Sequence, residues 1–164
     1  MTAWAEFRPR EILERLTARG VDFVVVGGFA AVIHGSPRLT QDLDLCCARD
    51  PANLQALGEL LIALNARLYG IEEELPFVAD ERTLRGTEIL TLQTDLGKVD
   101  LLANPEGSPS YPALKASAER VDIEGLLISV ASISALVAMK RAAGRPKDLA
   151  DIAELEVIER LRGR

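Results

Sequence analysis

The chain has 164 residues, enough for one ordinary domain with a sizeable core. Apolar residues make up 48% and charged residues 27%, a globular composition that excludes a disordered chain. The formal net charge of −6 argues against a broad, non-specific nucleic-acid binder, because such a protein needs lysine and arginine to neutralise phosphate.

The cysteines and the N-terminal segment exclude two further classes of protein. Cys46 and Cys47 are adjacent inside an apolar run, which is neither a disulfide framework nor a metal-binding spacing. The N-terminal MTAWAEFRPR lacks an apolar signal core, and no window holds the roughly 20 apolar residues of a membrane span. We therefore expect a soluble, cytoplasmic protein with no membrane partner, in which both cysteines are small core residues.

The first third of the chain predicts helix, strand and helix in turn. Ile12, Leu13 and Leu16 recur at helical spacing within 9–19, and Gly20 ends that segment. Residues 22–26 form a short β-branched run, typical of a buried strand, which stops at Gly27-Gly28. Residues 29–34 fit a short helix closed by Gly35.

The middle of the chain begins with a strand in which polar and apolar residues alternate. This alternation, over residues 41–47, predicts one solvated face. Asp50-Pro51 is a helix-start signal, and we expect a helix over 51–68. Residues 71–86 have room for a short strand and a helical turn. Residues 88–94 and 98–102 predict two strands joined by the turn Asp95-Leu96-Gly97.

The last third predicts a loop, a strand pair and two helices. In chain order these are a loop at 104–109, strands at 120–123 and 126–130, and helices at 132–143 and 146–161, with Gly144-Arg145-Pro146 between the helices. A helical opening, a mixed β middle and a helical tail indicate an α/β (α+β) fold. We expect one domain over 1–164, with a catalytic core at about 21–130 and a helical tail at about 131–164.

Three aspartates in the predicted strands are the strongest candidates for chemistry. Asp42 and Asp44 are two residues apart in one strand, so both carboxylates project from the same face while Leu43 packs behind them. Paired carboxylates repel unless a proton or a cation lies between them, and magnesium suits oxygen ligands. Asp100 lies among apolar residues in a later strand, where an unpaired charge is costly. Asp-x-Asp alone is common, and Asp100 alone fits a strand end or a salt bridge.

Gly27-Gly28 strengthens the case for these aspartates. The pair follows a buried strand and opens a short helix, so bare backbone N–H groups lie where helices bind anions. A tight turn is the simpler reading of two glycines. Together with the three aspartates, the glycine pair predicts a site that binds both phosphate and a metal ion.

The combined pattern resembles the nucleotidyltransferases of the DNA polymerase β superfamily. The resemblance rests on Val26-Gly27-Gly28, then Asp42-Leu43-Asp44-Leu45 thirteen residues later, and Asp100 on a later strand. The stretches Gly28-Phe-Ala-Ala, His34-Gly35, Arg38-x-Thr40 and Lys140-Arg141-Ala-Ala-Gly144-Arg145-Pro-Lys147-Asp148-Leu-Ala-Asp151 resemble the (AbiEii-like) nucleotidyltransferase toxins of type IV abortive-infection systems and their stand-alone relatives. The likeness spans about Val21 to Leu155.

This resemblance implies a minimal nucleotidyltransferase fold, a mixed sheet flanked by helices, and a role for each site residue. Asp42 and Asp44 would coordinate two magnesium ions, with manganese as a substitute. Asp100 would complete the second site and help to deprotonate the attacking hydroxyl. The residues expected to hold the nucleoside triphosphate are Gly27, Gly28, Ser36, Arg38, Thr40 and Lys140.

Several of these residues also have a structural reading. Arg38 also fits a surface arginine, and Thr40 either favours the strand or orients Asp42. Lys140 fits a solvated helix end as well as a phosphate contact. Asp148 and Asp151 are expected to cap and pair within the last helix, Asp148 with Arg145 or Lys147. For His34 we expect no catalytic role, because metal-dependent transfer needs no imidazole.

The predicted activity is magnesium-dependent transfer of a nucleoside monophosphate from an NTP to an acceptor hydroxyl, with release of pyrophosphate. The acceptor is a tRNA 3′ end, a protein side chain or a small molecule such as an aminoglycoside. The resemblance also implies a toxin with an antitoxin partner. The alternatives are a non-catalytic module that binds a nucleotide or a partner, and a structural calcium or magnesium site, which would not need the glycine pair.

Overall fold

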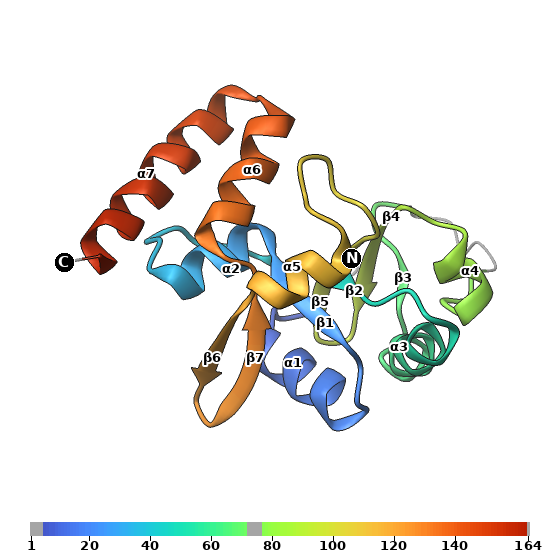
Figure 1. Ribbon diagram of the computed structural model, residues 1–164. Helices are drawn as coiled ribbons and strands as arrows, with labels where there is room; N and C mark the ends of the chain where they lie inside the picture. The colour runs from blue at the N-terminus through green and yellow to red at the C-terminus, as the bar shows by residue number, and fades with distance from the viewer. Residues whose placement is uncertain (1–4, 72–76, 164) are drawn as a thin grey trace.

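A seven-stranded mixed sheet lies at the centre of the computed structural model, which describes residues 5–71 and 77–163 (Figure 1). The strand order is β3-β4-β5-β2-β1-β7-β6. The strands are β1 (Phe23–Val26), β2 (Asp42–Cys47), β3 (Arg67–Leu68), β4 (Ile89–Thr94), β5 (Gly97–Leu102), β6 (Glu119–Ile123) and β7 (Leu126–Val130). β1 pairs parallel with β7 and β2 parallel with β5, while the other pairs are antiparallel.

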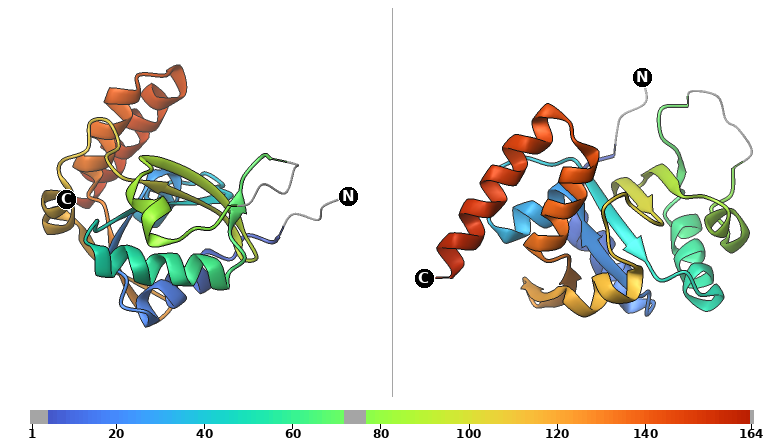
Figure 2. Two further views of the ribbon diagram at one scale, coloured as in Figure 1. Left: turned by 90° about the vertical axis from the view of Figure 1, so that its right-hand side faces the viewer. Right: turned by 45° about the horizontal axis from the view of Figure 1, so that its top comes forward.

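Seven helices surround this sheet in the described part of the chain. They are α1 (Pro9–Ala18), α2 (Gly27–His34), α3 (Pro51–Ala63), α4 (Glu81–Arg85), α5 (Tyr111–Ser117), α6 (Ile133–Ala143) and α7 (Pro146–Arg162). α6 and α7 lie side by side at one end of the molecule, and α3 lies at the other end (Figure 2). The observed elements confirm the predicted α/β class and its helical C-terminal segment.

The two faces of β2 have opposite character. Leu43 and Leu45 are buried on one face, where Leu45 meets leucines of α3 and α4. Asp42 and Asp44 are half-buried on the other face, beside the start of α2. The two-residue period of the strand therefore directs the core to one side and the carboxylates to the other.

Most predicted elements are present close to their predicted bounds. The helix predicted over 9–19 is α1, the strands predicted over 88–94 and 98–102 form the antiparallel pair β4 and β5, and the two C-terminal helices are α6 and α7. Glu124 and Gly125 both have positive φ in the turn between β6 and β7, the geometry of a tight hairpin. Cys46 and Cys47 are buried, free thiols, as predicted.

Two predicted helix bounds were wrong, and one helix was not predicted. α2 begins at Gly27 rather than at residue 29. α3 ends at Ala63 rather than at residue 68, because Asn65 adopts a left-handed conformation (φ 53°) and Arg67 pairs with Gln93 of β4. The segment before β6 contains α5, which the sequence analysis did not predict.

The segment 71–86, for which we predicted a short strand and a helical turn, lies partly outside the described residues. Its helical turn corresponds to α4, and the strand falls on a stretch that includes 72–76. In the described ranges, no helix is both long and apolar enough to cross a membrane.

Candidate functional site

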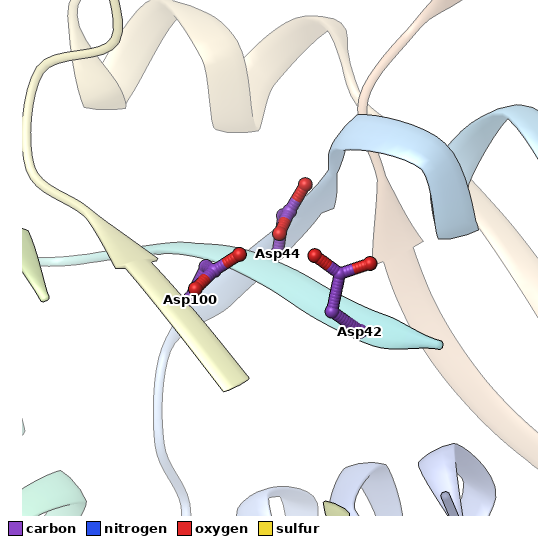
Figure 3. A group of neighbouring side chains, drawn as sticks. All are labelled: Asp42, Asp44 and Asp100. Atoms are coloured by element: carbon purple, nitrogen blue, oxygen red, sulfur yellow. The ribbon is translucent and has the colours of Figure 1, made fainter. Parts of the chain in front are cut away.

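Three carboxylates meet on the solvated face of β2 and β5. Asp44 lies directly opposite Asp100 in the parallel pairing of these strands, and Asp42 is two residues before Asp44. One carboxylate oxygen of each aspartate lies within 4.8 Å of the others. Figure 3 shows the three side chains on the same side of the two strands. The structure therefore brings together the three predicted metal ligands from positions up to 58 residues apart (100 minus 42).

The positive charge around this cluster does not offset the mutual repulsion and burial of its carboxylates. Burial, the contact with Asp100 and the charge of Asp42 raise the pKa of Asp44 to about 8. Burial also raises the pKa of Asp100. Among the described residues, the buried atoms Asp44 Oδ1 and Asp100 Oδ1 have no hydrogen-bond partner. A hard divalent cation would supply both the charge and the missing partner, so the donor set fits magnesium or manganese.

Gly27 allows the α2 N-terminus to approach the carboxylates closely. Its φ is +68°, and a Cβ built on it would lie 1.9 Å from Asp44 Oδ2. Only glycine fits that contact. The first backbone N–H groups of α2 thus begin beside the triad, and no side chain caps this end of the helix.

Thr40 and Gly28 lie next to each other at the same end of α2. The Thr40 hydroxyl donates to Asp42 Oδ1 at 3.1 Å and also contacts the Asp42 carbonyl oxygen at 3.2 Å. This hydrogen bond fits the alternative in which Thr40 orients Asp42. A Cβ on Gly28 would meet Thr40 Oγ1 at 3.4 Å, an ordinary contact, so Gly28 is not required by packing.

A cleft of about 830 Å³ opens above the triad. That volume suits a small-molecule ligand. Besides the three aspartates, it is lined by every residue predicted to hold the triphosphate, namely Gly27, Gly28, Ser36, Arg38, Thr40 and Lys140. The cleft is also lined by Glu88, by Ile89 at the start of β4, and by Glu106 after β5.

The corner between α6 and α7 carries a buried ion-pair network along one wall of the cleft. Asp148 is fully buried, and Arg145 Nε lies 2.8 Å from its carboxylate. Hydrogen bonds from Arg145 lower the pKa of Asp148 to about 2. Lys140 Nζ lies 2.9 Å from Asp151 and 3.5 Å from Asp148. The predicted pairing of Asp148 with Arg145 is present, and both aspartates also hold Lys140 of the neighbouring helix.

The loop between α2 and β2 is tied to α7 by two polar contacts. The Ser36 hydroxyl donates to the Glu154 carboxylate, and Arg38 forms an ion pair with Asp151. Ser36 and Arg38 therefore lie at the cleft with their polar groups engaged by helix α7. These contacts join residues more than 100 positions apart, and the sequence analysis did not predict them.

His34 lies outside the cleft lining. Its ring is buried, with Nε2 2.8 Å from the carbonyl oxygen of Ala131 and Nδ1 3.6 Å from Glu119. These contacts connect α2 to the β6–β7 hairpin region, which is a structural role.

Lys98 is a site residue that the sequence analysis missed. It lies opposite Asp42 in the β2–β5 pairing, and its Nζ is 3.6 Å from Asp42 Oδ2 and 3.8 Å from Asp100 Oδ2. The same Nζ lies 4.6 Å from the ring centre of Tyr69. The spacing Lys98-x-Asp100 in a strand was the available signal, because residues two apart share a face.

Several solved structures have a similar fold. A lincosamide antibiotic adenylyltransferase, LnuA, solved with lincomycin bound, superposes with a TM-score of 0.60 at 16% identity, over 93% of this chain and 99% of that one. The antibiotic-resistance factor ANT(2″)-Ia, in complex with adenylyl-2″-tobramycin, has a TM-score of 0.57 at 16% identity, over 94% of this chain and 92% of that one. A nucleotidyltransferase-like structure (TM1012) from Thermotoga maritima has a TM-score of 0.50 at 19% identity, over 98% of each chain. The fold is that of a nucleotidyltransferase.

The sequence assigns the chain to one family within that class. Residues 11–159 match the family described as "Nucleotidyl transferase AbiEii toxin, Type IV TA system". The chain belongs to this AbiEii family and is a nucleotidyltransferase. Among curated proteins, no sequence matches the chain.

Proposed function

We propose that the protein transfers a nucleoside monophosphate from an NTP to an acceptor hydroxyl and releases pyrophosphate, in a magnesium-dependent reaction. The observation that carries this proposal is the meeting of Asp42, Asp44 and Asp100 beside the uncapped N-terminus of α2, at the floor of one cleft. A divalent ion bound there would stabilise charge on the attacking and leaving oxygens at the α-phosphate.

The residues of the chain have separate tasks in this reaction. The three aspartates would hold the divalent ions, and Thr40 keeps Asp42 oriented through its 3.1 Å hydrogen bond. Asp100, whose pKa is raised, accepts the proton of the acceptor hydroxyl as its oxygen bonds to the α-phosphorus and the bond to pyrophosphate breaks. Backbone N–H groups at Gly27 and Gly28 bind the triphosphate.

Arg38 and Lys140 would contact the phosphates from the wall opposite β4. Both already contact Asp151, so an incoming triphosphate competes with that carboxylate for them. Asp151 thereby holds the two cations at the cleft before the nucleotide arrives. Ser36 is engaged by Glu154 and supports the same wall.

Three classes of acceptor are considered. Membership of a type IV toxin–antitoxin family supports a toxin with an antitoxin partner, and a tRNA 3′ end is the first class of acceptor that we propose to test. The adenylyltransferases of similar fold carry small antibiotics, lincomycin and adenylyl-2″-tobramycin, in their structures. A protein side chain is the third class of acceptor.

The test is transfer of label from each α-labelled NTP, with magnesium, to total tRNA, to protein, and to an aminoglycoside or lincosamide. The controls are Asp42→Asn/Asp44→Asn, which removes the metal ligands without changing size, and Glu159→Gln, which removes an exposed charge of α7 away from the cleft lining. We expect label transfer and pyrophosphate release by the wild type and the Glu159 variant only.

The class of acceptor that gains label identifies the substrate. Magnesium-dependent nucleotide binding with no transfer to any acceptor would instead support a non-catalytic nucleotide-binding module. Equal transfer by the Asp42→Asn/Asp44→Asn variant would refute the proposed role of the carboxylates.

A further inference from the structure

The ammonium group of Lys98 lies beside two of the three carboxylates of the triad. It lies on β5 two residues before Asp100 and directly opposite Asp42, so its side chain shares their face of the sheet. Its Nζ lies 3.6 Å from Asp42 Oδ2 and 3.8 Å from Asp100 Oδ2. The Lys98 side chain is 27% exposed and that of Asp42 is 34% exposed, so these contacts are partly shielded from solvent.

Tyr69 holds the ammonium group at this position. Its ring centre lies 4.6 Å from Lys98 Nζ, within the range of a cation–π contact. Tyr69 follows β3, and its backbone N–H donates to the carbonyl oxygen of Thr91 in β4, which holds the backbone of Tyr69 beside the sheet. Lys98 is thus placed between an aromatic ring on one side and two carboxylates on the other.

Two pairs of oxygens in the triad differ in their partners. Asp42 Oδ2 and Asp100 Oδ2 face Lys98. Asp44 Oδ1 and Asp100 Oδ1 are buried and have no hydrogen-bond partner within the described residues. One side of the triad therefore already has a cation, and the other side has none.

The formal charges lead to the same division. When a divalent ion is bound and the three carboxylates are ionised, they carry −3, and Lys98 reduces this to −2, which the one ion neutralises. A second divalent ion would leave a charge of +2 next to the Lys98 ammonium. Like charges about 4 Å apart in a partly buried site repel strongly, so the second ion is disfavoured until a triphosphate adds negative charge.

We propose that Lys98 occupies a second cation position, so that the nucleotide-free protein binds a single divalent ion at the Asp44–Asp100 side of the triad. This inference rests on the proposed function, because it assumes that the triad binds metal. It makes Lys98 a positioning residue that sets the number of bound ions. The two-ion arrangement implied by the family resemblance then requires the bound nucleotide.

The test is a titration of the full chain with Mn²⁺ in the absence of nucleotide, in which bound ions are counted by the loss of the free-Mn²⁺ EPR signal. We expect one bound ion for the wild type and for Lys98→Arg, which keeps the charge. For Lys98→Met we expect a second ion, bound at least tenfold more tightly than any second ion of the wild type.

Lys147→Met is the control, because Lys147 lines the cleft above the triad but forms no ion pair with the described residues. We expect it to bind one ion, like the wild type. Thermal unfolding of each variant checks that it folds. If Lys98→Met fails to fold, Lys98→Gln is the second neutral variant, for which we expect the same second ion.

The possible failures of the inference and of the function are distinguishable. Two ions of similar affinity in the wild type, or one ion in a folded Lys98→Met variant, would overturn the role of Lys98 and leave the proposed reaction intact. No Mn²⁺ binding by the wild type would overturn the metal site and with it the proposed function.

Discussion

Asp44 is a half-buried acid whose raised pKa couples the stability of the metal-free protein to pH. Its folded-state pKa is about 8, whereas an unfolded chain has the ordinary value near 4. Between these values the folded state keeps a proton that the unfolded state has lost. The free energy of unfolding therefore falls as pH rises from about 4 to about 8, by at most about 1.4 kcal/mol per pH unit from this group.

Unfolding of chelator-treated protein between pH 5 and pH 9 tests this coupling. We expect the loss of stability to be steeper in the wild type than in Asp44→Asn, whose side chain cannot ionise. Excess Mg²⁺ should restore stability to the wild type at pH 9, because an ion that binds only the folded state stabilises it. Identical pH profiles for the two proteins would contradict the raised pKa.

Gly27 and Gly28 offer a matched pair of substitutions at adjacent positions. Gly27→Ala places a methyl group 1.9 Å from Asp44 Oδ2 at a φ of +68°, so we expect it to displace the carboxylate and reduce transfer at least a hundredfold. Gly28→Ala meets Thr40 Oγ1 at 3.4 Å, so we expect the fold to be retained. The measurements are thermal unfolding, Mn²⁺ binding and label transfer.

The outcome for Gly28→Ala separates packing from nucleotide binding. If Gly28 provides close backbone access to the triphosphate, its alanine variant binds Mn²⁺ normally but has a higher KM for NTP. An Mn²⁺ affinity of Gly27→Ala equal to that of the wild type would show that the close approach to Asp44 does not matter.

Among the elements, α7 depends on a buried carboxylate for its attachment. Asp148 has no exposed surface and bonds Arg145, which precedes the helix, and Lys140 of α6. Asp148→Asn removes the charge that both cations need, so we expect a lower melting temperature than for Glu159→Gln, an exposed substitution on the same helix. Circular dichroism melting at pH 7 measures the difference.

The same contact predicts a dependence on low pH. The pKa of Asp148 is lowered to about 2, so its stabilising effect is present above about pH 4 and is lost as pH falls toward 2. Wild type and Asp148→Asn should therefore approach each other in stability as pH falls from about 4 to about 2. A constant difference down to pH 2 would contradict the assigned pKa.

For the whole molecule, the charge distribution predicts weak intrinsic attraction to RNA. The net charge is −6, and Arg38, Lys140 and Arg145 at the cleft are all engaged by Asp148 or Asp151. Few cations are then free to release counterions from phosphates. Without metal and NTP we expect a Kd for total tRNA weaker than roughly 100 μM at physiological salt.

Filter binding over a range of salt concentrations measures this affinity. A slope of log K against log salt close to zero would agree with few phosphate contacts. Micromolar binding with a steep slope would contradict the prediction and identify a basic surface outside the cleft. A macromolecular acceptor would then bind there rather than through the paired residues of the cleft wall.

Local pattern determined the elements and the shared face of Asp42 and Asp44, because strand and helix periods depend only on neighbouring residues. The turn at Gly125 and the break at Gly144 follow from conformations that only a few residue types adopt. Prediction from the local pattern failed for a short helix, and for a helix whose end depends on pairing with a distant strand. α5 has only seven residues, and α3 ends where the chain turns to pair with β4.

Tertiary structure alone decided which residues face one another across the site. The parallel register of β2 and β5 places Asp44 opposite Asp100 and Lys98 opposite Asp42. The contact of Arg38 with Asp151 joins a loop near the start of the chain to its last helix. Such pairs depend on strand order and helix packing, which are properties of the whole chain. The sequence by itself therefore determined which residue types are available for metal and phosphate, and the folded sheet decided that Lys98 shares the triad with them.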